Sequence, residues 1–325
     1  MEKKWKWGIL GTARIAQKAF IPGLLRSTNG TLHAIAGRKH ARISEFEKAF
    51  SPGVSYTSYE ELLKDRSVEA VYIPLPNALH KGWAIKAMES GKHVLCEKPL
   101  GLNPTEVEEM TRVSREQGVV LMEAFAYIHN PLIQEMKSEL ASGKIGTMHS
   151  MVSTFSFDLN VRPEDIRWVR ELGGGAMYDL GCYTIHLSRF FAGSRVQKVE
   201  ALGKCTPDEQ IDASASVILE FENGISSHFN VSFEQAYRTR FEVQGTEGAI
   251  FTNHPFNESG NLTWHLLQKG GQVIREVASP DNYFLEAQHF GEVLSGKIGP
   301  KISLEDSLEN ARVIQHVLEK IGYGE

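Results

Sequence analysis

The chain has 325 residues, 42% of them hydrophobic and 23% charged, which is typical of an ordinary globular protein long enough for two domains. Its net charge is only -5 and it contains no basic block, so it lacks the electrostatic signature of nucleic-acid or anionic-membrane binding. The three cysteines, Cys96, Cys182 and Cys205, are too few and too scattered for a disulfide framework or a zinc cluster. We therefore expect no metal site and a cytoplasmic location.

The amino-terminal stretch from Met1 to Trp7 carries the positive charge of a signal peptide but lacks an apolar run of adequate length behind it. No segment reaches the roughly 18 apolar residues of a membrane span. We expect neither a signal peptide nor a membrane anchor.

From Trp5 to about Ala124, short apolar runs alternate with helical stretches. This alternation is typical of βαβ units and predicts a doubly wound parallel sheet of the Rossmann type over residues 1–124. The predicted strands are 8–10, 32–36, 70–73, 94–95 and 119–122, and the predicted helices are 15–25, 41–50, 78–88 and 105–116.

After Tyr127 the pattern changes to an alternation of period two on either side of Glu222-Asn223-Gly224. Asn-Gly between alternating runs is the strongest short-range hairpin signal, so we expect an open, mostly antiparallel sheet. Two late helices are predicted over 283–294 and 304–321. The second domain, residues 125–325, is thus expected to be α+β and to bind substrate, and its last helix is expected to pack back on the first domain.

The apolar run Val94-Leu95-Cys96 ends abruptly in Glu97-Lys98-Pro99. In an open α/β sheet, ligands bind beyond the carboxyl ends of the strands, so Lys98 is the leading catalytic candidate. The proline holds Lys98 in an extended turn and makes a cis bond affordable. The alternative is an ordinary strand-to-helix turn with a solvated lysine.

The first predicted strand runs into Gly11-Thr12-Ala13-Arg14-Ile15, which also opens the first helix. This is the setting of a dinucleotide fingerprint, in which the pyrophosphate lies at a helix N-terminus. Ala13 and Ala16 stand where the second and third glycines would be, so a turn chosen for packing is the alternative. We predict that Gly11 to Ile15 bind a dinucleotide.

The second predicted strand ends in Gly37-Arg38-Lys39, without the acidic residue that would bind the ribose of NAD. A guanidinium there can grip the 2′-phosphate of NADP, which a carboxylate would repel. We therefore predict NADP(H) in preference to NAD(H), the alternative being a solvated helix start.

The segment from Ile73 to His80 opens another helix at the same edge of the sheet. Further cofactor contacts are predicted for five residues near the strand ends: Pro74, Pro76, Asn77, His80 and Glu97. The alternative role of Asn77 is that of a helix N-cap. The alternative for His80 is a structural role, because a lone histidine is more often structural.

A second dense motif runs from Gly173-Gly174-Gly175 to His186. If a helix begins near Gly181, Asp179 caps it and Tyr183 shares a face with Asp179. A cap and a packed tyrosine are the structural alternative. Together with Lys98, however, this carboxylate and phenol make a plausible proton-transfer set.

Seven motifs in order make the chain resemble the oxidoreductases grouped around glucose-fructose oxidoreductase, inositol 2-dehydrogenase and a rhizopine-catabolism protein. They are Gly8-Ile9-Leu10-Gly11, Ala36-Gly37-Arg38, Pro76-Asn77-Ala78-Leu79-His80, Glu97-Lys98-Pro99, Gly173-Gly174-Gly175, the run from Asp179 to Tyr183, and Gly245-Thr246-Glu247-Gly248. The resemblance covers nearly the whole chain. It implies a Rossmann domain followed by an open antiparallel sheet that serves as a dimer interface.

The resemblance also implies roles for individual residues. Lys98 would lie near nicotinamide and substrate, Asp179 would orient the substrate, and Tyr183 would occupy the position of a catalytic histidine in inositol dehydrogenases. A tyrosine there is more similar to NADP-dependent xylose dehydrogenases and dimeric dihydrodiol dehydrogenase. Arg167 and His186 are weaker substrate candidates.

One departure concerns Ile128, which stands where many relatives carry an arginine, so substrate preference is expected to differ from the sugar-oxidising members. The expected activity is hydride transfer between NADP(H) and a carbonyl or secondary alcohol of a sugar-like or cyclic-diol substrate. The sequence leaves open whether Lys98 or Tyr183 moves the proton directly. The alternatives are a dinucleotide-sensing regulator and a redox-neutral, NAD-dependent glycoside-cleaving relative.

Overall fold

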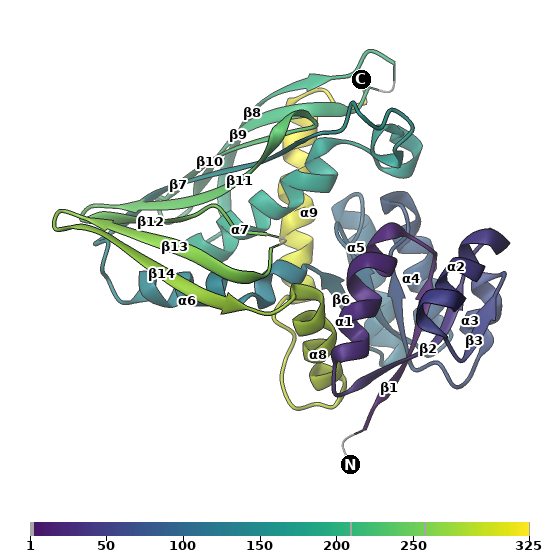
Figure 1. The fold of residues 1–325 in the computed structure, drawn as a ribbon. Coiled ribbons are helices and arrows are strands. Elements are labelled where there is room, and N and C mark those ends of the chain that lie inside the picture. Colours follow the sequence, from purple (N-terminus) through teal and green to yellow (C-terminus); the bar gives the residue numbers. More distant parts are fainter. Residues whose placement is uncertain (1–2, 209, 257, 325) are drawn as a thin grey trace. The chain divides into compact units, whose positions relative to one another are not determined.

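The computed structural model describes residues 3–208, 210–256 and 258–324, and the chain divides into two compact units (Figure 1). The first unit comprises Met1–Ala126 and Asp281–Leu308, and the second comprises Tyr127–Pro280 and Glu309–Glu325. Met1 and Glu2, which belong to the stretch considered for a signal peptide, lie outside the described residues.

The first unit is built on a six-stranded parallel sheet with the order β3-β2-β1-β4-β5-β6, which is the order of a Rossmann domain. Its strands are β1 (Trp5–Leu10), β2 (Gly30–Ala36), β3 (Val54–Tyr56), β4 (Ala70–Ile73), β5 (His93–Glu97) and β6 (Leu121–Ala124). Its helices are the π-helical η1 (Ala16–Phe20), α1 (Ile21–Arg26), α2 (His40–Phe50), α3 (Tyr59–Lys64), the 3-10 turn η2 (Asn77–Leu79), α4 (His80–Glu89), α5 (Pro104–Gln117) and α8 (Asn282–Leu294).

Helix α8 groups with the first unit although it comes late in the chain. It packs along α1, as Figure 1 also shows, and its Phe290 joins Trp7 and Phe20 in the core of the parallel sheet. The predicted second domain, which runs without interruption from 125 to 325, therefore differs from this division. The reason is that α8 buries its apolar face against the Rossmann sheet.

The second unit is built on an eight-stranded sheet with the order β14-β13-β12-β11-β7-β10-β9-β8, antiparallel except for the pair β7 and β10. Its strands are β7 (Met148–Asp158), β8 (Val196–Cys205), β9 (Asp212–Phe221), β10 (Ser226–Ser232), β11 (Glu234–Gly245), β12 (Gly248–Thr252), β13 (Gly260–Gln268) and β14 (Gly271–Ser279). The short helices are α6 (Pro131–Ala141), η4 (Ile166–Trp168), η5 (Arg170–Leu172), the π-helical η6 (Met177–Gly181) and α7 (Cys182–Ala192). Two further elements, η3 (Ala126–His129) and α9 (Leu304–Lys320), cross the boundaries between the units.

The two faces of this sheet differ in composition. Along β9 the odd positions from Ala213 to Phe221 are buried, whereas Ser216, Ile218 and Glu220 are exposed. Figure 1 shows α7 against one face of the sheet, while the opposite face carries no helix. The predicted Asn223-Gly224 hairpin joins β9 to β10, with Gly224 at a φ of +81°. The predicted fold class, a Rossmann domain followed by an α+β domain with an open sheet, is thus confirmed.

Across the residues that the structure describes, none of the helices is long and apolar enough to cross a membrane. In the same residues, His, Cys, Asp and Glu side chains form no group of three that could hold a metal ion.

Candidate active site

Gly11 makes the tight turn between β1 and the first helix of the Rossmann unit. Its φ is +122°, a conformation that favours glycine, and its N–H donates to the Ala36 carbonyl at 2.9 Å. A Cβ at this position would lie 3.0 Å from Leu75 Cδ2 and 3.9 Å from the Pro74 carbonyl oxygen. The positive φ and the close approach of Leu75 therefore both require a glycine here, and the helix that follows begins with N–H groups of the kind that bind phosphate.

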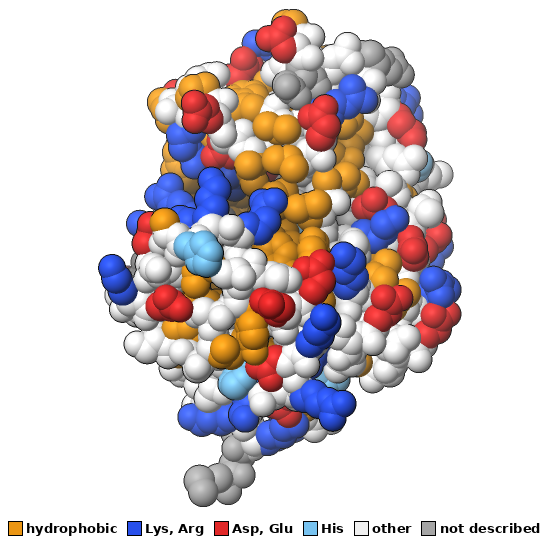
Figure 2. Space-filling view, turned by 90° about the vertical axis from the view of Figure 1, so that its right-hand side faces the viewer, with side chains coloured by type: hydrophobic (Ala, Val, Ile, Leu, Met, Phe, Trp, Pro, Cys, Tyr) orange, Lys and Arg blue, Asp and Glu red, His pale blue; other side chains and the backbone are white. Residues whose placement is uncertain are grey.

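Exposed cations rim this turn. Arg14, Arg38 and Lys39 are exposed, and Figure 2, which looks onto the side that carries α2 and α3 in Figure 1, shows Lys and Arg side chains grouped there. Burial raises the pKa of the Tyr59 phenol, and the charge and hydrogen bond of Arg38 act in the opposite direction. The residues at this edge fit a dinucleotide that carries an additional phosphate on its ribose.

Arg42 is a residue that sequence reasoning missed. Its Nη2 donates to the Thr12 carbonyl at 3.2 Å and to Gln17 Oε1 at 3.3 Å, so that α2 fixes the turn after Gly11. Arg42 lies in the first turn of α2, four positions after Arg38, and this closeness to a predicted cofactor contact could have drawn attention to it.

The segment after β4 packs against the Lys98 turn through His80. His80 is fully buried, with Nδ1 at 2.8 Å from the Pro99 carbonyl oxygen and Nε2 at 2.8 Å from that of Leu75. Burial lowers the pKa of His80, which the two carbonyl contacts oppose. Both ring nitrogens are thus engaged in holding the two strand-end loops together.

Asn77 is not the N-cap that its alternative interpretation required. It is the first residue of η2, whose N-cap is Pro76, while α4 has Leu79 at its N-cap and no side-chain cap. Asn77 does not cap the α-helix because the 3-10 turn moves the start of that helix three residues along the chain, to His80.

The Lys98 turn is fixed on both sides by neighbouring elements. The Lys98–Pro99 peptide bond is cis, and the Leu100 N–H donates to Glu123 Oε1 at 2.9 Å. Lys98 itself is only half-buried, whereas Glu97 is buried and accepts a hydrogen bond from the Tyr72 hydroxyl. Lys98 thus directly follows the carboxyl end of β5, in a turn that the Glu123 side chain ties to β6.

A fully buried acid lies near this turn. Neither carboxyl oxygen of Glu286 has a hydrogen-bond partner within the described part of the chain. Burial and the charge of Glu97 raise the pKa of Glu286 well above its usual range. The core of the first unit thus holds a carboxyl group whose burial disfavours its charged form.

In the second unit, one helical segment carries both of the other candidates. It begins at Met177, with η6 leading into α7, so Asp179 lies inside the first turn and does not cap a helix at Gly181 as predicted. The alternative interpretation of Asp179 as an N-cap is wrong because the helix starts four residues earlier. Asp179 and Tyr183 remain four residues apart on this segment.

Arg167 lies directly on Asp179. Its Nε donates to Asp179 Oδ2 at 2.6 Å and its Nη1 to Asp165 Oδ1 at 3.1 Å. The two carboxylates raise the pKa of Arg167, with Asp179 making the larger contribution. Asp179 is only 9% exposed, and this short contact with Arg167 fixes the direction of its carboxylate.

Tyr183 is packed among aromatic rings from three other segments. The rings of Tyr127, Phe155 and Phe256 lie 5.7, 5.8 and 5.4 Å from it between centroids. His186, one turn further along the helix, is buried with Nδ1 at 2.5 Å from the Tyr127 hydroxyl. The ring of Tyr183 is thus fixed by its aromatic neighbours, and His186 contacts one of these neighbours, Tyr127.

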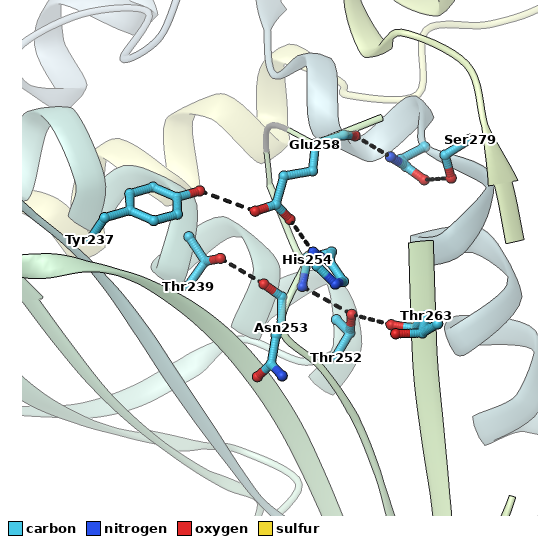
Figure 3. Close-up of polar contacts among 9 residues, drawn as sticks. Tyr237, Thr239, Thr252, Asn253, His254, Glu258, Thr263 and Ser279 are labelled. Carbon is cyan, nitrogen blue, oxygen red and sulfur yellow. Dashed lines mark hydrogen bonds and ion pairs between the residues drawn. The ribbon is translucent and has the colours of Figure 1, made fainter. Parts of the chain in front are cut away.

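The loop after β12 supplies Phe256, one of the three aromatic rings around Tyr183. Figure 3 shows Tyr237, His254 and Glu258 pointing toward one another, with Glu258 Oε2 at 2.7 Å from His254 Nδ1 and Oε1 accepting from Tyr237 at 3.1 Å. Asn130 Nδ2 donates to the Glu258 carbonyl at 3.2 Å. No local motif in the sequence marks this loop, because its polar partners Tyr237 and Asn130 come from distant segments.

Comparison with known proteins matches both units. The profile described as "Oxidoreductase family, NAD-binding Rossmann fold" matches residues 5–125, and the one described as "GFO/IDH/MocA C-terminal domain" matches residues 133–251.

Full-length relatives are also similar. The chain is 36% identical to D-xylose 1-dehydrogenase (NADP(+)) 2 of Haloferax volcanii over 98% of both chains. It is 30% identical to trans-1,2-dihydrobenzene-1,2-diol dehydrogenase of Sus scrofa over 98% of this chain and 97% of the relative. Among solved structures, a 3-ketoreductase from Actinomadura kijaniata in complex with NADP and TDP-benzene matches with a TM-score of 0.93 and 28% identity over 98% of both chains.

Proposed function

This chain belongs to the Gfo/Idh/MocA family as an NADP(H)-dependent oxidoreductase, and from that premise we propose the substrate class and the residues that act on it. The substrate is a sugar-like molecule or a cyclic diol, and the reacting group is a carbonyl or a secondary alcohol. Two full-length relatives, a D-xylose 1-dehydrogenase and a trans-1,2-dihydrobenzene-1,2-diol dehydrogenase, support this class.

Gly11 and the residues that follow it, Thr12 to Ile15, bind the pyrophosphate, and Arg38 binds the 2′-phosphate. The positive φ of Gly11 and the exposed guanidinium of Arg38 beside Tyr59 support this assignment. The strand-end residues Pro74, Pro76, Asn77 and Glu97 shape the remainder of the cofactor site, and His80 holds its loops together. NADP(H), when bound, supplies the hydride at its nicotinamide ring.

The proton is handled by Lys98 and Tyr183. In reduction, Tyr183 donates a proton to the nascent alkoxide and Lys98 stabilises the negative charge that develops. In oxidation, Tyr183 accepts the hydroxyl proton as the phenolate, which Lys98 stabilises. Asp179 accepts a hydrogen bond from a substrate hydroxyl, and the contact with Arg167 directs the Asp179 carboxylate toward it.

The observation that carries the proposal is that Asp179 and Tyr183, on one helical segment, are both held in place by neighbouring side chains. Asp179 is held by a 2.6 Å contact with Arg167, and Tyr183 is held by three aromatic rings. A carboxylate and a phenol that are fixed in this way can orient a polyhydroxylated substrate and exchange a proton with it.

We test the proposal with a panel of aldoses, polyols, vicinal diols and dicarbonyls, following NADP(H) absorbance. On a substrate found in this way, Lys98→Met and Tyr183→Phe should each lower kcat by about 100-fold to 10,000-fold, because general acid–base assistance is worth that much. NADPH binding, measured by fluorescence, should stay nearly unchanged.

Two positions outside the proposed proton-transfer set provide matched controls, Lys81→Met on α4, where Lys81 pairs with Glu109, and Tyr56→Phe on β3, where the Tyr56 hydroxyl donates to Asp65; both should keep kcat. If neither Lys98→Met nor Tyr183→Phe slows turnover, the proposed roles are wrong. If no substrate on the panel gives net turnover of NADPH, the sensing or the redox-neutral alternative replaces the proposal.

We also propose a cytoplasmic homodimer that forms through the open face of the second unit's sheet. Leu202 is 82% exposed and Ile218 is 46% exposed on this face, beside a hollow of about 520 Å³ that Val152 also lines. Isolated monomers rarely leave such a run of apolar side chains uncovered, and a second copy would bury it.

A further inference from the structure

Asp212 is a fully buried carboxyl group that the proposed reaction does not use. It is the first residue of β9 and is 0% exposed. Its Oδ2 accepts a hydrogen bond from the Met177 N–H at 2.6 Å, and the Ala176 N–H also bonds to it. Asp212 thus ties the end of a strand to the start of the helical segment that carries Asp179 and Tyr183.

The glycine run before this segment is shaped around Asp212. A Cβ on Gly175, whose φ is +119°, would lie 2.2 Å from Asp212 Oδ1. A Cβ on Gly174 would lie 2.5 Å from the Arg167 carbonyl oxygen. A glycine at position 175 allows the backbone to come close enough for Asp212 to receive the N–H groups, while Gly174 allows the close approach of the Arg167 carbonyl.

The first N–H groups of a helix have no partner within the helix and need acceptors from elsewhere. The N-cap residue here, Ala176, cannot supply one, because its side chain has no acceptor. The acceptor comes instead from Asp212, which follows Met177 by 35 residues in the chain and lies on a strand that contacts the start of the helical segment. The start of the helix is therefore fixed to the sheet and not only to its own loop.

We propose that Asp212 is a positioning residue for catalysis: by holding the N–H groups of Ala176 and Met177, it sets where Asp179 and Tyr183 lie. This inference rests on the proposed function, because it gives Asp212 a role only through those two side chains. Arg167 acts on the same segment from the other side, since its carbonyl accepts from the Gly175 N–H at 3.0 Å and its side chain binds Asp179.

The surroundings of Asp212 indicate that the acceptor oxygen matters more than the charge. Burial raises the pKa of Asp212 to about 8, although the backbone hydrogen bonds oppose this. The titratable groups that face it are Tyr323, whose hydroxyl donates to the Gly174 carbonyl at 2.8 Å, and Cys205 on β8. Near neutral pH Asp212 holds its proton, so an asparagine, which keeps one acceptor oxygen, is a close substitute.

The test compares Asp212→Asn with Asp212→Ala, using Glu220→Gln as a control at an exposed position of the same strand. In the full-length protein, Asp212→Ala should lower kcat by about 10-fold to 100-fold, because a displacement of about 1 Å of a reacting group costs that much. KM and the Kd for NADPH should change by less than about threefold, and Asp212→Asn should retain kcat to within about threefold, since only the acceptor is needed.

Hydrogen exchange gives a readout that does not depend on activity. The amides of residues 177–182 should exchange faster in Asp212→Ala than in the wild type, while those of β10 should not change. If Asp212→Ala fails to fold, Gly175→Ala replaces it, because its Cβ would displace the same contact and should lower kcat to a similar extent.

The inference is overturned if Asp212→Ala keeps kcat, or if Asp212→Asn loses as much activity as Asp212→Ala. Tyr183→Phe separates this failure from that of the proposed function. If Tyr183→Phe is inactive and Asp212→Ala is not, only the role of Asp212 is wrong. If Tyr183→Phe is fully active, the proposed function is wrong, and unchanged exchange at 177–182 would show that Asp212 does not hold the helix start either.

Discussion

His289 on α8 accepts a hydrogen bond that it must lose when it is protonated. The Lys301 N–H donates to His289 Nε2 at 3.1 Å, and the ring is only 6% exposed. Burial, together with the positive charge of Lys301, lowers the pKa of His289 from 6.5 to about 4. The folded first unit therefore requires the neutral imidazole, with its lone pair on Nε2.

The sign of the pH dependence follows from this lowered pKa. The unfolded chain takes up a proton near the ordinary pKa of histidine, whereas the folded chain resists it until about pH 4. The stability contributed by His289 is thus present above pH 6.5 and is lost as the pH falls toward 4. One pKa unit corresponds to about 1.4 kcal/mol, so the full loss is about 3 kcal/mol, of which about 2 kcal/mol falls between pH 7 and pH 5.

The variant His289→Gln keeps an acceptor oxygen at a similar reach but does not titrate. Urea unfolding of the wild type and the variant should therefore diverge, with the wild type losing about 2 kcal/mol more than His289→Gln between pH 7 and pH 5. The exchange rate of the Lys301 amide, corrected for intrinsic chemistry, should rise over the same range in the wild type only. His316→Gln, at an exposed position on α9, serves as the control and should follow the wild type.

A constant difference between wild type and His289→Gln from pH 7 to pH 5 would refute this reasoning. So would an NMR titration in which the His289 ring takes up its proton at the ordinary pKa in the folded protein. Either result would mean that the hydrogen bond from Lys301 does not control the protonation of the ring.

Three further predictions concern the cofactor, the aromatic rings around Tyr183 and the open sheet. Arg38→Ala should raise the Kd for NADPH by about 10-fold to 100-fold, the worth of a charge-assisted contact, and should leave the Kd for NADH within about threefold. Fluorescence titration decides this, and equal effects on both cofactors would contradict it. Phe256 is 1% exposed, so Phe256→Ala should leave a cavity and lower the free energy of unfolding by about 3–5 kcal/mol, whereas Phe256→Leu should lower it by less. Urea titration measures both variants, and equal losses would argue against close packing around Phe256. Leu202→Asp should yield monomers by light scattering at concentrations where the wild type is dimeric, and an unchanged mass would exclude this face as the interface.

Much of the Rossmann unit could be read locally from the sequence. Gly11 marked the first strand-to-helix turn because only glycine readily adopts its positive φ, and the apolar run before Glu97 marked a strand buried on both faces. The hairpin at Asn223-Gly224 was equally local, since turn chemistry and alternation lie within a few residues of each other. These features depend on short-range geometry, and they were predicted correctly.

The helix starts were harder to place. Asn77 and Asp179 are both good capping residue types, yet neither is a cap, because a cap depends on where the helix begins and that was set by packing. In the helical segment that carries Asp179, the acceptor for the first N–H groups is Asp212. Strand alternation would put Asp212 on the exposed side with Ser216 and Ile218, but the register shift at Cys205 leaves it buried.

By itself, the sequence determined the family, the type of each half of the chain, the cofactor and a short set of chemically capable residues, because each of these is encoded in short motifs or in periodicity. Only the tertiary structure decided what surrounds those residues. The ion pair of Arg167 with Asp179, the three rings around Tyr183 and the buried acceptor Asp212 join segments that are far apart in the chain. Such contacts form only when a whole unit packs its core, and no local pattern can specify them.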